Sequence, residues 1–196
     1  MENLIIHISG ASGSGKTTLG NKLKEHFKSK IVVKDLDDLR DEFIKKFYDN
    51  KKWTYIDENE YQSYINDYIN KQKKPIIFVG LNDNTRYGKN KNLYYNVHSQ
   101  HNYYIELDDM IIVKQKCIRL LNNIQTNKIA MEDLVKDNEK FVKKFTEAIK
   151  MECSVKQTIK QNNKWKKDYD KQGYKFMSRK NIYKSVVIIL NNKFSK

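Results

Sequence analysis

The residues whose types and spacing most clearly suggest a chemical role form one short segment near the start of the chain, at 10–17. They read Gly-Ala-Ser-Gly-Ser-Gly-Lys-Thr and fit the pattern G-x-x-x-x-G-K-[ST]. An apolar run typical of a strand precedes them at 4–8, and residues 18–27 carry leucine and phenylalanine at helical spacing. A strand, a glycine-rich loop and a helix in this order predict a loop that binds phosphate groups.

The residue types explain how such a loop holds a nucleotide. Glycines let the backbone curl so that its N–H groups face phosphate oxygens, and the following helix adds the positive end of its dipole. Lys16 is expected to reach the β- and γ-phosphates, and the Thr17 hydroxyl to hold Mg²⁺ between them. We therefore expect a nucleoside triphosphate site, with ATP as the ligand and Mg²⁺ as its cation; a plain Gly/Ser turn is the alternative. The expected binding residues are Gly10, Ala11, Ser12, Gly13, Ser14, Gly15, Lys16, Thr17 and Thr18.

A second group of candidate residues follows the next apolar run, 31–34, and reads Asp-Leu-Asp-Asp-Leu-Arg at 35–40. Open α/β sheets bind ligands at the carboxyl ends of their strands, where a carboxylate can orient or deprotonate an attacking hydroxyl and an arginine can clamp the acceptor. At this extended strand end Asp35 and Asp37 are expected to project to one side and Asp38 to the other, so at most two of the three can face the phosphates. We assign Asp37 to the acceptor hydroxyl and Asp35 to the magnesium shell through water. Asp38 is expected at a helix start, as its cap or in its first turn.

These two segments resemble those of small P-loop kinases that act on metabolites and nucleotides. The loop and the residues after it look like the loop of gluconate kinases. The stretch 35–40 looks like the Asp-Gly-Asp-Asn-x-Arg stretch of adenylylsulfate kinases, and is similar to the Arg-Asp-Asp-Tyr-Arg stretch of phage-type polynucleotide 5′-kinases. In the last family the first Asp of the pair is the general base and the Arg binds the acceptor phosphate. The resemblance, which is specific over 4–40, implies these roles for Asp37 and Arg40.

The sequence departs from the pattern of these kinases in two places. The third apolar run, 76–80, ends without an adjacent acidic residue, so the usual carboxylate that organises magnesium must be replaced by Asp83 or Asp35. Nucleoside monophosphate kinases carry several arginines in a helical lid over the phosphates. The corresponding region of this chain shows Arg119 but no such run of arginines. Arg119 follows Asp108 at about the distance at which such kinases place their first lid arginine, which implies a catalytic role; a plain surface position is the alternative.

The rest of the chain predicts an α/β fold, a P-loop NTPase three-layer sandwich with a five-stranded parallel sheet. The expected strands are 4–8, 31–34, 76–80, 103–107 and 173–178, and the expected helices include 18–27, 41–48, 60–71 and 181–190, with another that ends at 123. No strand interrupts 125–170, which carries two amphipathic helices, the second of them very rich in lysine. We expect one domain with a core of about 1–124 and 171–196 and a helical lid insertion at about 125–170 that excludes water from the phosphates. A solvated hairpin with no gating role is the alternative.

Composition limits the remaining possibilities. The 196 residues contain 38 Lys and Arg against 24 Asp and Glu, a net charge of +14 that attracts anions. Arginine occurs only at Arg40, Arg86, Arg119 and Arg179, so much of the charge reflects a general excess of lysine. The two cysteines show no metal-binding or disulfide spacing, and no apolar run is long enough to cross a membrane. We expect a cytoplasmic protein with no membrane partner and no targeting segment before the first strand.

A phosphate-binding loop alone fits several classes of protein, and the group at 35–40 favours a kinase. No Asn/Thr-Lys-x-Asp segment in a plausible place supports a GTPase. We expect transfer of the γ-phosphate of Mg-ATP to a hydroxyl or phosphate of a small metabolite, nucleoside or nucleotide. One alternative is a polynucleotide 5′-kinase or a basic nucleic-acid-binding ATPase, for which a nucleic acid would be the partner. The other is a regulatory protein that binds nucleotide without turnover.

Overall fold

The computed structural model describes residues 3–48, 58–81, 97–126 and 135–195. Their contacts divide the chain into two compact units. The first unit holds residues 1–10, 15–105 and 173–196, and the second holds 11–14 and 106–172. Within the described residues, no helix is both long enough and apolar enough to cross a membrane.

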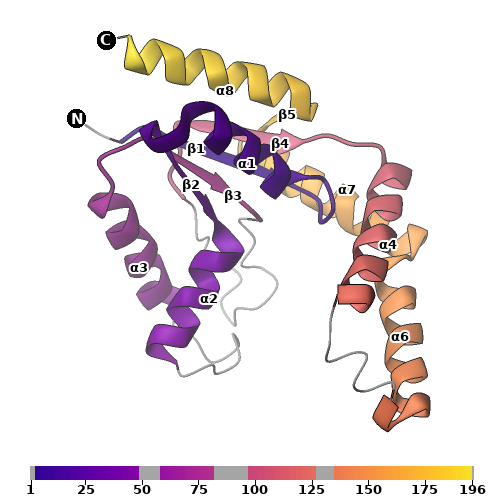
Figure 1. Ribbon diagram of the computed structural model, residues 1–196. Coiled ribbons are helices and arrows are strands. Elements are labelled where there is room, and N and C mark those ends of the chain that lie inside the picture. Colours follow the sequence, from indigo (N-terminus) through magenta and orange to yellow (C-terminus); the bar gives the residue numbers. More distant parts are fainter. Residues whose placement is uncertain (1–2, 49–57, 82–96, 127–134, 196) are drawn as a thin grey trace. The chain divides into compact units, whose positions relative to one another are not determined.

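The first unit is built around a sheet of five parallel strands (Figure 1). The strands run in the order β2-β3-β1-β4-β5, so the fully buried β1 lies at the centre between β3 and β4. The expected fold class is confirmed, because a parallel sheet is covered by helices and the glycine loop follows its central strand. The strands are β1 (Ile5–Gly10), β2 (Val32–Asp35), β3 (Ile76–Val79), β4 (His101–Ile105) and β5 (Lys175–Met177).

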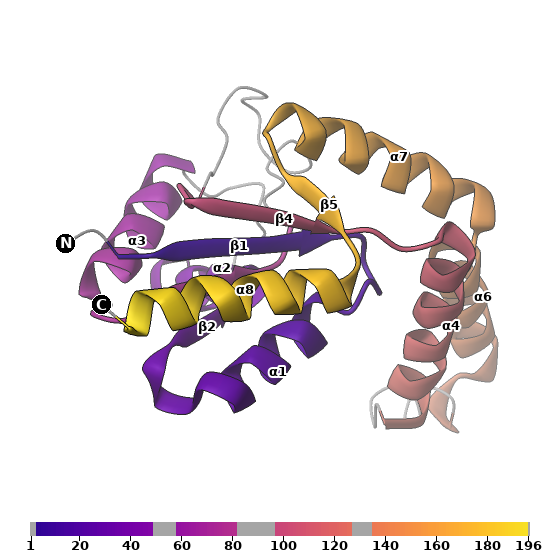
Figure 2. The ribbon, with the colours of Figure 1, turned by 90° about the horizontal axis from the view of Figure 1, so that it is seen from above.

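Helices cover both faces of this sheet. Helices α1 (Lys16–Phe27) and α8 (Arg179–Phe194) lie side by side on one face (Figures 1 and 2). A short 3-10 turn, η1 (Lys28–Lys30), leads from α1 to β2. Helices α2 (Leu36–Phe47) and α3 (Glu58–Lys71) lie on the other face (Figure 1). The unit therefore has three layers, as the sequence predicts.

The two faces are filled by alternating side chains of the same strands. On one face, α1 approaches so closely at Gly20 that an added Cβ would lie 3.0 Å from Cγ1 of both Val33 and Val79. On the other face, Ile76 and Phe78 pack in a cluster with residues of α2 and α3. Because successive side chains of a strand point to opposite faces, the continuous apolar run of β3 fills both cores. The rest of that cluster is Ile5, Leu36, Leu39, Phe43, Tyr61, Ile65 and Val97.

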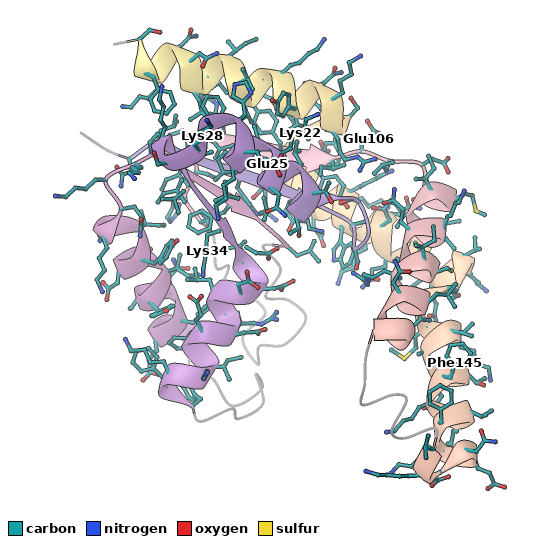
Figure 3. The ribbon with its side chains drawn as sticks, viewed as in Figure 1. Lys22, Glu25, Lys28, Lys34, Glu106 and Phe145 are labelled. Carbon is teal, nitrogen blue, oxygen red and sulfur yellow. The ribbon has the colours of Figure 1, made fainter. Side chains whose placement is uncertain are left out.

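The layer of α2 and α3 is also tied to β2 through one lysine side chain. Lys34, labelled in Figure 3, donates a hydrogen bond to the Glu42 carboxylate of α2. Its ammonium also lies 5.8 Å from the centre of the Tyr68 ring of α3. These contacts fix the two helices near the carboxyl end of β2, which is the end that carries the acidic group at 35–40.

The described residues of the second unit form three helices, and this unit also holds residues 11–14 of the glycine loop. The helices are α4 (Asp109–Thr126), α6 (Asn138–Glu152) and α7 (Val155–Lys171), and α4 packs against both of the others. Between α4 and α7, the Lys116 ammonium donates to the Thr158 hydroxyl over 3.3 Å, and both side chains are buried. On α6, the ring of Phe145, which Figure 3 labels, stacks on the ring of Phe141 with the two centres 6.0 Å apart.

Candidate functional site

The candidate residues of the first unit gather where its parallel strands end. The pairing of strands places Val79 of β3 opposite Asp35 of β2 on one side and Ile8 of β1 on the other. The glycine loop leaves β1 two residues after Ile8, and α2 begins one residue after Asp35. The two segments identified from the sequence therefore meet at one edge of the sheet, which is the edge where open α/β sheets bind ligands.

The loop has the backbone geometry that binding of phosphates requires. Gly13 and Gly15 have φ values of 83° and 84°, which only glycine adopts readily, and the Ser14 N–H donates to the Ala11 carbonyl over 3.0 Å. Helix α1 begins at Lys16, so its first N–H groups face the same loop. The Lys16 ammonium lies 2.8 Å from the Gly10 carbonyl oxygen, which holds the lysine along the loop.

One loop side chain carries a hydrogen-bonding group that the protein itself does not satisfy. The Ser14 side chain is fully buried, and within the described part of the chain its hydroxyl has no hydrogen-bond partner. Leaving a buried hydroxyl without a partner is costly, so such groups commonly bind a ligand or a water molecule. The buried Ser14 hydroxyl is a hydrogen-bonding group that fits a phosphate oxygen.

The expected magnesium residues lie within hydrogen-bonding distance of each other. The Thr17 hydroxyl donates to Oδ2 of Asp35 over 3.1 Å, which links the start of α1 to the end of β2. Burial raises the pKa of the Asp35 carboxyl, while the bonds from the Asp37 N–H and from Thr17 act in the opposite direction. Two hard oxygen donors fit Mg²⁺, which takes one or two carboxylates together with substrate phosphates. In the described part of the chain, no group of three or more His, Cys, Asp and Glu side chains forms a fuller metal site.

The end of β3 explains why no carboxylate follows this strand. Gly80 has a φ of 139°, and a Cβ at this position would lie 2.9 Å from Cβ of Leu36. An aspartate would therefore collide with the first residue of α2. The adjacent strand supplies Asp35 at this edge of the sheet, whereas Asp83, the other candidate replacement, lies outside the described residues.

The group at 35–40 is not extended, and the expected alternation of its side chains is wrong. Asp35 is the N-cap of α2, because its side chain accepts a hydrogen bond from the Asp37 N–H over 3.0 Å. The helix therefore begins at Leu36, and Asp37 and Asp38 both lie in its first turn. Asp38 does not cap the helix. The backbone turns here because the cap satisfies an N–H group that would otherwise lack a partner.

The helical backbone brings Asp37 next to Arg40. Nη1 of Arg40 donates to Asp37 over 2.9 Å, while Nε and Nη2 donate to Asp41 over 3.1 and 3.0 Å. Partial burial tends to lower the pKa of Arg40, but the neighbouring carboxylates outweigh it and raise the pKa. Asp37 remains exposed. Two carboxylates thus fix the orientation of the arginine at the rim of the site.

Arg119 lies on an exposed face of α4 in the second unit. The contacts that place Thr17, Asp35, Asp37 and Arg40 together all belong to the first unit. A catalytic role for Arg119 therefore stays a proposal.

Sequence reasoning missed Arg179, which belongs to the first unit like Arg40 and contacts the glycine loop. A Cβ on Gly15 would lie 2.6 Å from Nη1 of Arg179, so the guanidinium rests directly against the loop backbone. Arg179 is the first residue of α8, which Ser178 caps. Gly15 and Arg179 are more than 160 residues apart, so no local pattern indicates their contact. The only feature of Arg179 in the sequence is that arginine is rare in this lysine-rich chain.

His7 of β1 was also missed, since it lies within an apolar run. It is fully buried; Nε2 donates to the Gly80 carbonyl over 3.2 Å, and Nδ1 accepts a hydrogen bond from the Tyr174 hydroxyl. Burial lowers its pKa to about 4, and the nearby Lys16 charge acts in the same direction. A neutral imidazole therefore connects β1 with the end of β3 and with the segment before β5.

The chain is matched by no protein-family model and has no significant match among curated proteins. Among solved structures it is similar to thymidylate kinase from Ehrlichia chaffeensis, with 18% identity and a TM-score of 0.37 over 65% of this chain and 85% of that one. It is also similar to an uncharacterized protein from Eubacterium ventriosum, with 15% identity and a TM-score of 0.46 over 97% of this chain and 99% of that one. At these values neither likeness bears on the activity, which is inferred from this chain's own residues.

Proposed function

We propose that this protein is a P-loop kinase that transfers the γ-phosphate of ATP to a hydroxyl or phosphate of a small metabolite, nucleoside or nucleotide. The observation that carries the proposal is the hydrogen bond from Thr17 to Asp35 beside a glycine loop with positive φ angles. In this arrangement the loop N–H groups and Lys16 bind the phosphates, and Thr17 and Asp35 hold Mg²⁺. The bound cation would neutralise charge on the transferred phosphoryl group.

The remaining residues of the site act on the acceptor. Asp37 is exposed at the start of α2, where it orients or deprotonates the attacking hydroxyl. Arg40 binds and positions the acceptor with a guanidinium whose orientation is already fixed by Asp37 and Asp41. Arg119 would add positive charge to the phosphates if the second unit serves as the expected lid.

The charge of this region favours a small acceptor over a polynucleotide. Five carboxylates and one arginine occur between 35 and 42, within a chain whose net charge is +14. A polyanion that approaches α2 would meet this local excess of negative charge, and like charges disfavour association. A small acceptor with one phosphate or none meets less repulsion and can use Arg40 as its partner.

The test measures transfer of radiolabelled γ-phosphate from Mg-ATP to separate panels of nucleosides, nucleoside monophosphates, sugar acids and 5′-hydroxyl oligonucleotides. Lys16→Ala should lower transfer by at least about 10²-fold, the usual effect of removing one preorganised donor to a transition state. Circular dichroism should be unchanged, because the loop conformation depends on glycines and backbone bonds. Lys24→Ala, an exposed position on the same helix, is the matched control.

The result also separates the alternatives. Labelling of oligonucleotides alone would identify a polynucleotide kinase. Binding of ATP with no acceptor labelled above the level of the Lys16→Ala variant would contradict the kinase and favour a regulatory nucleotide-binding protein.

A further inference from the structure

Helix α7 carries a straight row of lysines on its outer side. Its buried residues, Thr158, Asn162, Trp165 and Tyr169, define one face of the helix, on which Thr158 and Asn162 form hydrogen bonds with α4. The row is formed by Lys156, Lys160, Lys164, Lys167 and Lys171, all of which are exposed. At about 100° per residue these five fall within an arc of about 80°, opposite the buried face, and follow one another at about 4.5 to 6 Å along the helix axis. We call them the α7 lysine row.

The charge of this row is not neutralised by its surroundings. The helix has two acidic residues, Asp168 and Asp170, which lie about 80° to either side of the centre of the row by the same geometry. Counting only 3–48, 58–81, 97–126 and 135–195, none of the five ammonium groups forms an ion pair. Like charges one turn apart destabilise a helix, so the row does not arise as a device for helix stability.

A general excess of lysine does not account for the row either. The neighbouring helix α6 is also rich in lysine, yet Glu147 lies within one turn of both Lys143 and Lys144, as expected for a mixed solvated face. On α7, Asp168 lies within one turn of Lys164 and Lys171, and Asp170 lies within one turn of Lys167, whereas Lys156 and Lys160 have no acidic residue one turn away on this helix. Helix α6 carries four lysines against three glutamates and α7 carries six lysines against two aspartates, so positive charge is more concentrated on α7.

We propose that the α7 lysine row binds the sugar-phosphate backbone of a nucleic acid without reading its bases. A line of evenly spaced ammonium groups matches a linear series of phosphates, each of which releases a counterion when it is neutralised. The row contains no aromatic side chain on which a base could stack and no arginine that could read a base edge. Binding is therefore sequence-independent.

A membrane surface fits this row less well. Amphipathic helices that lie on membranes bury apolar side chains between the lipids, but the side chains of Trp165 and Tyr169 are already buried in the protein. The inference goes beyond the proposed kinase activity, because it concerns another helix and needs no ATP. The bound nucleic acid need not be the phosphate acceptor.

The experiment compares two triple variants of the full-length protein. Lys156→Gln/Lys160→Gln/Lys164→Gln removes three charges from the row. Lys114→Gln/Lys143→Gln/Lys150→Gln removes three exposed charges from α4 and α6 and leaves the same net charge. Glutamine and lysine have similar helix propensities, so both variants should keep the fold. A third variant, Lys156→Arg/Lys160→Arg/Lys164→Arg, keeps the charge.

Fluorescence anisotropy measures binding to labelled oligo-dT and to a short duplex, without ATP. For the wild type, five phosphate contacts predict a loss of affinity on the order of 10² to 10³ between about 50 and 200 mM salt. The row variant should lower the slope of log K against log salt by about 2 to 3. The control triple and the arginine triple should keep the wild-type slope.

Three results would overturn the proposal. The first is no binding of either nucleic acid at low salt. The second is an equal loss for the row variant and the control triple, which would show that only the net charge matters. The third is binding of the wild type to vesicles of phosphatidylserine and phosphatidylcholine but not to the oligonucleotides, which would assign the row to an anionic membrane.

Discussion

Asp35 serves two purposes with its two oxygens. Oδ1 accepts the Asp37 N–H and begins α2, while Oδ2 accepts the Thr17 hydroxyl. Asp35→Asn keeps a good helix cap, so its free energy of unfolding should change by only a few tenths of a kcal/mol. The loss of one anionic oxygen should raise the magnesium concentration needed for half-maximal turnover. Titration of turnover with Mg²⁺ measures this, and an unchanged requirement would remove Asp35 from the metal site.

Asp37 and Asp38 are adjacent in the sequence, but we expect only Asp37 to take part in catalysis. Both lie in the first turn of α2 and both are exposed, but Asp37 pairs with Arg40. Asp37→Asn should lower kcat by about 10² to 10⁴, the usual contribution of a positioned base. Asp38→Asn is the matched control and should leave kcat near the wild-type value. Steady-state kinetics with the identified acceptor test this, and the reverse order of effects would show that Asp38 is the base.

The conformation of the glycine loop could be predicted because it depends on neighbours within the same loop. Lys16 and Thr17 follow Gly15 directly, and the spacing of the motif contains that relation. The positions of Asp37 and Asp38 could not be predicted in the same way. Where β2 ends and α2 begins depends on the cap that Asp35 makes and on the space beside Leu36, and that space is set by a glycine more than 40 residues away.

At the scale of elements, α2 is positioned by its close approach to the end of β3. Gly80→Ala would combine a positive φ with a contact of 2.9 Å to Cβ of Leu36. Gly173→Ala is a matched control, since its φ of 74° is also strained but no atom lies within 4 Å of the added Cβ. The control should cost about 1 to 2 kcal/mol of strain. Gly80→Ala should cost about 1 to 3 kcal/mol more, because a packed backbone must move.

Urea unfolding of the two variants gives this difference. Gly80→Ala should also weaken turnover, because displacement of α2 moves Asp37 and Arg40 together. Equal destabilisation by both substitutions would show that α2 tolerates the added methyl group without moving.

Strand positions were predictable to within a few residues because continuous apolar runs mark buried parallel strands. The fourth strand shows the limit of this signal. The sequence favours 103–107, whereas β4 is His101–Ile105. His101 and Asn102 are polar, yet they pair with Ile6 and His7 of the central strand. Pairing with β1, almost 100 residues earlier, extends β4 into polar sequence. No local sequence pattern predicts a contact over this separation.

At the scale of the whole molecule, the net charge of +14 does not describe any single surface. Residues 35–42 carry a local excess of carboxylates, whereas the α7 lysine row carries only positive charge. A prediction from composition alone assigns one anionic partner to the whole chain. The arrangement of charge along helices instead favours the proposed small acceptor at α2 and the proposed nucleic acid at α7, two roles that separate variants can test.

The stability of the molecule as a whole should fall in mild acid because of His7. This side chain lies in the central strand, and burial lowers its pKa from 6.5 to about 4. Between these values the unfolded chain binds a proton that the folded protein does not, so stability falls as pH decreases through this range. At about 1.4 kcal/mol per pKa unit, the loss is about 3 kcal/mol. It should be absent above pH 6.5 and complete below about pH 4.

His7→Gln tests this, because glutamine can donate and accept hydrogen bonds but does not titrate. Urea unfolding at several pH values from 7 to 4 should show a shallower decline for His7→Gln than for the wild type, even if the variant is less stable at neutral pH. The subtraction of two curves removes the contribution of the carboxylates, which both proteins share. If the wild type and His7→Gln decline in parallel, protonation of His7 does not control acid unfolding, and other buried groups must do so.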